Sequence, residues 1–75
     1  MTQTATQTRS VAESPVDNAT YNLMQALTSK LEAIEAYETY RQDGDGEAQR
    51  LFDELLSDER RHAERLLEAI RNRLR

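Results

Sequence analysis

The chain of 75 residues has no cysteine or tryptophan, and it contains only one proline, two glycines and one histidine. Without cysteine there is no disulfide framework and no zinc site built on thiolates, so neither can stabilise so short a chain. The sequence also has no glycine-rich phosphate loop. Its first residues contain no apolar run that could act as a signal peptide or a membrane span, so we expect a cytoplasmic protein.

Positive charge is also in the minority. The chain has 10 Lys and Arg residues and 14 Asp and Glu residues, which gives a net charge of -4. Basic side chains are concentrated only at Arg71, Arg73 and Arg75, where they complement the C-terminal end of a helix. This balance argues against nucleic acid or an anionic membrane as the partner. No nucleophile lies beside a base, so hydrolase and kinase functions have no support either.

What the sequence does contain predicts an all-α helical hairpin. Residues 1–13 are rich in Thr, Gln and Ser, which is typical of a disordered tail. The remaining residues, 14–75, are expected to form helix one over about 15–42, a turn over 43–46 and helix two over about 47–74.

The expected helix boundaries follow from capping chemistry. Ser14 can cap helix one with Pro15 in its first turn, or the helix can begin later, at Asn18. The turn has the sequence Asp-Gly-Asp-Gly, and Gly44 and Gly46 can adopt the positive φ that closes a helix.

Two ionisable residues interrupt the apolar stripe of helix two. This stripe contains Ala48, Leu51, Phe52, Leu55, Glu59, His62, Leu66, Ala69 and Ile70. Glu59 and His62 are three residues apart, so they share a helical face and can bind one cation together. A buried carboxylate needs a proton, a cation or a metal, and we therefore take these two residues as candidate metal ligands.

A single hairpin cannot shield this stripe from water. Two helices of about 26 residues, each about 40 Å long, leave their shared face open, so we expect two copies to pair as a four-helix bundle. A two-fold axis would bring Glu59 and His62 of both copies into one central site. Divalent iron or manganese suits such a set of oxygen and nitrogen ligands, and zinc is an experimental substitute.

The stretch 51–66, with Asp58-Glu59-Arg60-Arg61-His62-Ala63, resembles the second metal-binding helix of rubrerythrins and related ferritin-like proteins. Residues 26–27 and 31–37 resemble their first helix. A half-length hairpin is most similar to the encapsulated ferritin-like proteins, which are cargo of encapsulin shells. The resemblance implies a di-iron or mononuclear centre, ferroxidase-type oxidoreductase activity, a homodimer or a ring of dimers, and enclosure in an encapsulin compartment.

The sequence departs from this family at one position that matters. The first helices of the family resemble Glu-x-x-Ala-x-x-x-Tyr, in which the glutamate is a ligand, and aligning Ala33 and Tyr37 places Lys30 there. Geometry reaches the same residue independently, because a hairpin centred on the turn brings Lys30 level with Glu59. A cationic side chain is therefore expected beside the candidate ligands.

Three hypotheses remain open at this point. In the first, Glu59 and His62 of each copy bind one or two iron ions, and Lys30 supports the carboxylates from the side. In the second, Lys30 pairs with Glu59 in place of the metal, and the protein is a metal-free structural or interaction module. In the third, the hairpin docks its apolar face on a different protein. Two lysines beside two metal ions would repel them, which weighs toward the second hypothesis.

Three further residues are weaker candidates for the site. Tyr37 could gate a metal centre or carry an electron, although core packing is the commoner role of a buried tyrosine. Glu35 and Glu38 could supply carboxylates if the helices slide by one turn, although a solvated position or a salt bridge between subunits is the expected role for both.

Overall fold

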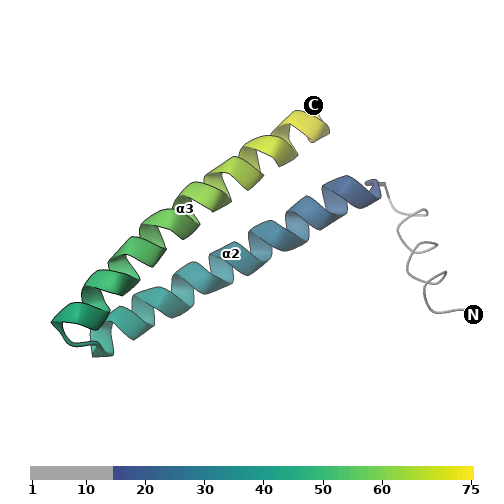
Figure 1. Cartoon of the computed structure of the whole chain (residues 1–75). Helices are drawn as coiled ribbons and strands as arrows, with labels where there is room; N and C mark the ends of the chain where they lie inside the picture. Colours follow the sequence, from purple (N-terminus) through teal and green to yellow (C-terminus); the bar gives the residue numbers. More distant parts are fainter. Residues whose placement is uncertain (1–14) are drawn as a thin grey trace, which may run out of the picture.

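A computed structural model describes residues 15–75 of the chain, so the predicted disordered tail lies outside the described residues. Helix α2 (Asn18–Asp43) and helix α3 (Gly46–Leu74) lie side by side and antiparallel, and two residues connect them (Figure 1). The all-α hairpin predicted from the sequence is therefore present. Neither helix of this described part contains a segment apolar enough to cross a bilayer.

Helix α2 begins at Asn18 because Asp17 caps it. The Asp17 backbone is extended, and its carboxylate accepts a hydrogen bond from the Thr20 backbone N–H at 2.8 Å. Of the two starts that the sequence left open, the structure has the later one, and Pro15 precedes the helix. The cap predicted at Ser14 falls outside the described residues.

The turn between the helices is tight, but not for the reason that the sequence suggested. Gly44 has φ -86° and ψ 157°, so the prediction of a positive φ is wrong at this position. A Cβ on Gly44 would lie 3.0 Å from the Ala48 Cβ and 3.3 Å from the Gln49 backbone nitrogen. Close approach therefore favours glycine here, because a larger residue would push the start of α3 away by a few tenths of an ångström. Asp45 then caps α3, accepting a hydrogen bond from the Ala48 N–H at 2.9 Å.

The core of the hairpin is a seam along the line where α3 meets α2. Its buried apolar residues are Leu56, Ala63 and Ile70, which are spaced seven residues apart as in a coiled coil. Leu56 and Ala63 were missing from the predicted stripe, whereas Leu51, which belonged to it, is 52% exposed. The stripe combined two faces of α3, one that packs on α2 and one beside it that remains open.

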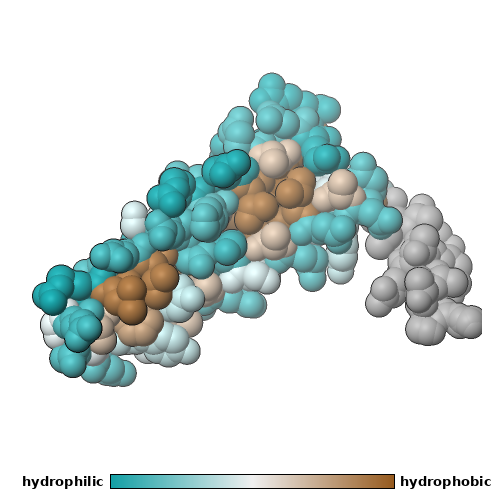
Figure 2. Space-filling view, viewed as in Figure 1, coloured by the Kyte–Doolittle hydropathy of each residue, from teal (hydrophilic) through white to brown (hydrophobic). Residues whose placement is uncertain are grey.

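Much of the apolar surface of the hairpin remains exposed. Its exposed large apolar residues are Tyr21, Met24, Leu31, Tyr40, Leu51, Leu67 and Leu74. On the face seen in Figure 2, apolar side chains form one group near the turn and another nearer the open end, with hydrophilic side chains between them. One pair of helices thus buries only part of what the sequence offers for a core.

Candidate metal centre

Lys30 and Glu59 meet between the two helices. The Lys30 Nζ atom lies 3.0 Å from Glu59 Oε1, which is the register expected from the position of the turn. The Glu59 side chain is 17% exposed and the Lys30 side chain 35%, so the carboxylate is the more buried partner. On α3, Glu59 lies between Leu56 and Ala63, and it therefore interrupts the apolar seam.

The inner oxygen of Glu59 has an unusual environment. Oε1 is sealed from solvent, and no group within residues 15–75 donates a hydrogen bond to it. The Lys30 ammonium is close enough for an ion pair, but it approaches outside the directions in which a hydrogen bond forms. A buried carboxylate oxygen without a donor is costly, and a cation is what satisfies it best.

His62 lies on the open side of this carboxylate. Its Nδ1 atom is 3.9 Å from Glu59 Oε1, and its side chain is 45% exposed. The prediction that His62 lies inside the buried stripe is therefore wrong for the single hairpin, where this residue borders the seam. Two ligand atoms that each lie about 2.1 Å from one metal ion are about 3.0 to 3.4 Å apart at octahedral or tetrahedral angles. The imidazole and the carboxylate would therefore have to approach each other by about 0.5 to 1 Å to hold the same ion, which a rotation of the half-exposed imidazole can provide.

A single copy supplies only part of a metal site. Within residues 15–75, no group of three or more His, Cys, Asp or Glu side chains is placed to hold a metal ion. By comparison, carboxylate-bridged di-metal bundles use a Glu from each of two helices and a Glu-x-x-His pair from each of the other two. Glu59 and His62 form one such pair, and Lys30 lies beside Glu59 on the facing helix.

Tyr37 contributes to an aromatic cluster near the turn. Its ring centroid is 6.3 Å from that of Tyr40 and 5.7 Å from that of Phe52, and the Tyr40 and Phe52 centroids are 5.7 Å apart. Tyr37 is two helical turns from Lys30 along α2, which corresponds to about 10 Å. The Tyr37 ring therefore packs on the aromatic residues near the turn and not on the Lys30–Glu59 pair.

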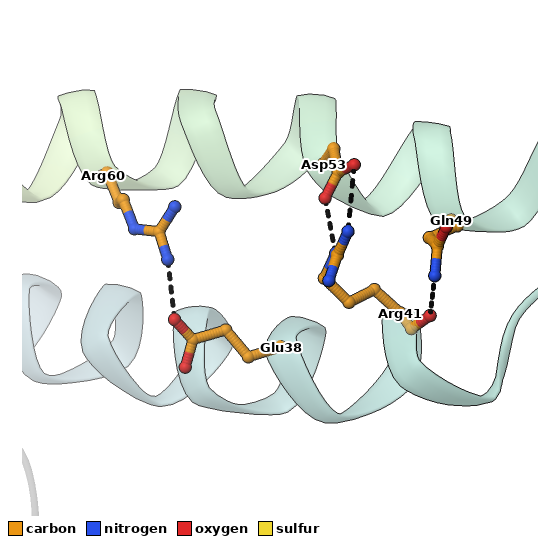
Figure 3. Close-up of polar contacts among 5 residues, drawn as sticks. All are labelled: Glu38, Arg41, Gln49, Asp53 and Arg60. Atoms are coloured by element: carbon orange, nitrogen blue, oxygen red, sulfur yellow. Dashed lines mark hydrogen bonds and ion pairs between the residues drawn. The ribbon is translucent and has the colours of Figure 1, made fainter.

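The two weaker carboxylate candidates lie elsewhere on α2. Glu38 accepts a hydrogen bond from Arg60 Nη2 at 2.6 Å on the exposed side of the seam (Figure 3). The Glu35 side chain is exposed, and its backbone carbonyl accepts a hydrogen bond from the Thr39 hydroxyl at 3.3 Å. The structure therefore brings neither carboxylate to Glu59 among the contacts of the described residues.

A second exposed ion pair lies closer to the turn. Arg41 donates two hydrogen bonds to Asp53, and this carboxylate raises the pKa of the Arg41 guanidinium (Figure 3). Gln49 also donates to the Arg41 carbonyl at 3.2 Å, which ties α3 to the end of α2. Sequence reasoning missed Arg41, Asp53 and Arg60. The available signal was that opposite charges flank the seam positions of both helices.

These two ion pairs border an open groove next to the seam. Its lining residues are Glu38, Arg41, Gln42, Asp53, Leu56 and Arg60. Both carboxylates of the groove are already paired with arginines, so it is a poor candidate for a cation site. The pair of Glu59 and His62 remains the candidate metal centre.

In a comparison with known protein families, the rubrerythrin family model matches residues 4–74. Neither a curated protein nor a solved structure matches the chain. The match spans both helices, and it agrees with the resemblance that the Glu-x-x-His segment carries.

Proposed function

Because the chain belongs to the rubrerythrin family, and so to the ferritin-like proteins, we propose that it binds iron at a site shared by two copies. In this proposal each copy contributes Glu59 as an oxygen ligand and His62 as a nitrogen ligand. The family suggests iron as the metal, and the mixed oxygen and nitrogen donors suit it.

The observation that carries the proposal is the state of Glu59 Oε1. This atom is buried and accepts no hydrogen bond from the described residues, and its neighbours are the Lys30 ammonium at 3.0 Å and an imidazole nitrogen at 3.9 Å on the same face. A carboxylate held in this way attracts a cation at short range. The residues present therefore fit a metal ion, although one hairpin provides only two of the ligands that it needs.

The exposed apolar side chains support pairing of two copies. Leu51 on α3 and Leu31 on α2 are each more than half exposed in the single hairpin, and a second hairpin packed along the length of both helices could cover them. A domain of this size gains little from its own core, so association is the expected remedy. Closing a four-helix bundle would also cover the exposed edge of His62.

Each residue of the site has a definite task in this proposal. Glu59 binds the ion from inside the seam, His62 binds it from the open side, and Lys30 offsets the charge of the carboxylate when no metal is there. Iron, when bound, would supply the ferrous and ferric states needed for oxidation by oxygen or peroxide. The protein residues would hold the ion in place and, in a closed bundle, exclude bulk water from it.

The contact between Lys30 and Glu59 favours a second candidate function. An ammonium 3.0 Å from the carboxylate already balances its charge, and two such pairs would leave a bundle neutral without iron. In that case the protein is a metal-free structural or interaction module, and the ion pair fixes the register of the two helices.

Metal binding and thermal unfolding, measured together, separate the two candidates. We expect anaerobic Fe(II) at about a hundred times its Kd to raise the Tm of the wild-type dimer by about 10 °C. His62→Ala should remove most of this shift. Arg61→Ala is the matched control, because the exposed Arg61 side chain pairs with Asp58 at 3.0 Å and not with the site.

The same measurements show how the proposal would fail. A folded dimer that gains no stability from Fe(II), and that is free of metal when purified from iron-supplemented cells, would support the metal-free module. A folded monomer in sedimentation at micromolar concentration would remove the shared site altogether and would favour docking on a different protein. Assembly into a ring of dimers and enclosure by an encapsulin shell stay predictions.

A further inference from the structure

Lys30 is the residue of the site that does not bind the ion in the proposed function. On the facing helix, a di-metal bundle would have a carboxylate ligand where this chain has an ammonium 3.0 Å from Glu59. From this contact we infer that Lys30 limits the shared site to at most one divalent ion per dimer. The inference rests on the proposed function, because it concerns the number of ions that the same site can hold.

A metal ion on Glu59 would lie close to the Lys30 ammonium. An ion bound to Glu59 Oε1 would lie about 2.1 Å from that atom. Since Lys30 Nζ is 3.0 Å from the same oxygen, the ion and the ammonium would be at most about 5 Å apart without a movement of the lysine. At that range, inside a partly buried seam, two positive charges repel each other strongly.

The charges of the dimer site are already balanced without metal. Two Glu59 carboxylates and two Lys30 ammonium groups sum to zero before any metal binds. One divalent ion would give the dimer site two positive charges, and two ions would give it four. A bundle with four carboxylates holds two divalent ions at zero net charge, which is why the replacement of a carboxylate by lysine is decisive for the second ion.

Lys30 has space to move away from Glu59. Its side chain is 35% exposed, so one ammonium can turn toward solvent when a single ion takes its place beside Glu59. A second ion would require the second lysine to turn away as well, and two divalent ions against two Glu59 carboxylates would leave two positive charges without compensation. One ion and one retained ion pair is thus the highest loading that these charges permit.

The experiment counts ions per chain by anaerobic titration calorimetry with Fe(II), and with Co(II) as an air-stable probe, while sedimentation confirms the dimer. We expect about one half ion per chain for the wild type and about one ion per chain for Lys30→Glu. Arg50→Glu is the control, because it makes the same change of charge on an exposed part of α3, nine residues from Glu59. It should leave the stoichiometry at the wild-type value.

Lys30→Met keeps the test decisive if Lys30→Glu does not fold. This variant removes the positive charge without adding a ligand, so we expect binding at least about tenfold tighter than in the wild type. Binding in Lys30→Met that is no tighter than in the wild type would overturn the inference. So would a wild-type dimer that holds two ions, or a folded Lys30→Glu variant with unchanged stoichiometry.

Failure of the proposed function would look different. If no variant binds metal, both the iron site and the inference are wrong. If the wild type binds none but Lys30→Glu binds about one ion per chain, the iron function fails for the natural chain. The limiting effect of Lys30 would then be confirmed in its strongest form.

Discussion

Two interhelical ion pairs start from adjacent residues of α3, yet they lie in different surroundings. Glu59 pairs with Lys30 in the seam, with side chains 17% and 35% exposed, whereas Arg60 pairs with Glu38 on the surface, where both side chains are at least half exposed. The surface pair has the shorter contact, at 2.6 Å against 3.0 Å. The length of the contact is therefore a poor guide to how much an ion pair contributes to stability, because losing one partner costs the most unfolding free energy where water cannot replace it.

The largest effect should come from breaking the seam pair on one side. Lys30→Ala leaves the Glu59 carboxylate without its counter-charge, so we expect the metal-free protein to lose about 2 kcal/mol of unfolding free energy. This is less than for a fully buried pair, because water still reaches part of the carboxylate. Urea denaturation at fixed protein concentration measures the loss. If Arg60→Ala costs as much, the contrast between the two pairs is wrong.

An intermediate effect is expected for an exposed carboxylate that also caps a helix. Hydrogen bonds from the Thr20 backbone and side chain, followed by the charge of Arg73, lower the pKa of Asp17. Asp17→Ala should lower the Tm by about 4 °C at neutral pH, and Asp17→Asn by less, because the amide oxygen still caps α2.

The pH dependence of this effect has a definite sign. Because the folded pKa of Asp17 is below its unfolded value, its contribution is complete above the unfolded pKa and is lost as the pH falls through the folded one. The difference between wild type and Asp17→Asn should therefore shrink in acid. A difference that stays constant down to strongly acidic pH would contradict the role of the ionised carboxylate.

The smallest effect is expected at the surface pair. A double-mutant cycle with Arg60→Ala and Glu38→Ala should give a coupling of about 0.4 kcal/mol, and this should nearly vanish in about 1 M salt. The matching cycle for Lys30 and Glu59 should retain most of its coupling at the same salt concentration. Equal salt sensitivity of the two cycles would mean that the seam pair is as well solvated as the surface pair.

The sequence predicted the register of the hairpin well and its packed face less well. The position of the turn was enough to bring Lys30 level with Glu59, because two helices joined by only two residues can slide little along each other. The apolar period did not separate the face that packs on α2 from the neighbouring open face. Leu56 and Ala63 were therefore missed, and His62 was placed deeper than it lies.

Two other features could not be read from residue types alone. Gly44 was expected to provide a positive φ, but what favours glycine is the short distance to Ala48 in the next helix, which depends on how closely the chain folds back. Likewise, the bonds of Arg41 and Arg60 across the seam depend on the reach of long side chains. The period and spacing of the sequence do not encode that reach.

The position of Glu59 halfway along the hairpin also determines how anything could reach it. The residue is 13 positions from the start of α3 and 15 from its end, so about 20 Å of helix lies on either side. An ion moving along the seam between α2 and α3 would have to pass several layers of packed side chains. In the single hairpin the short route is sideways, past the half-exposed imidazole of His62, so a second copy or another partner that covers this side of the hairpin would also close the route to the carboxylate.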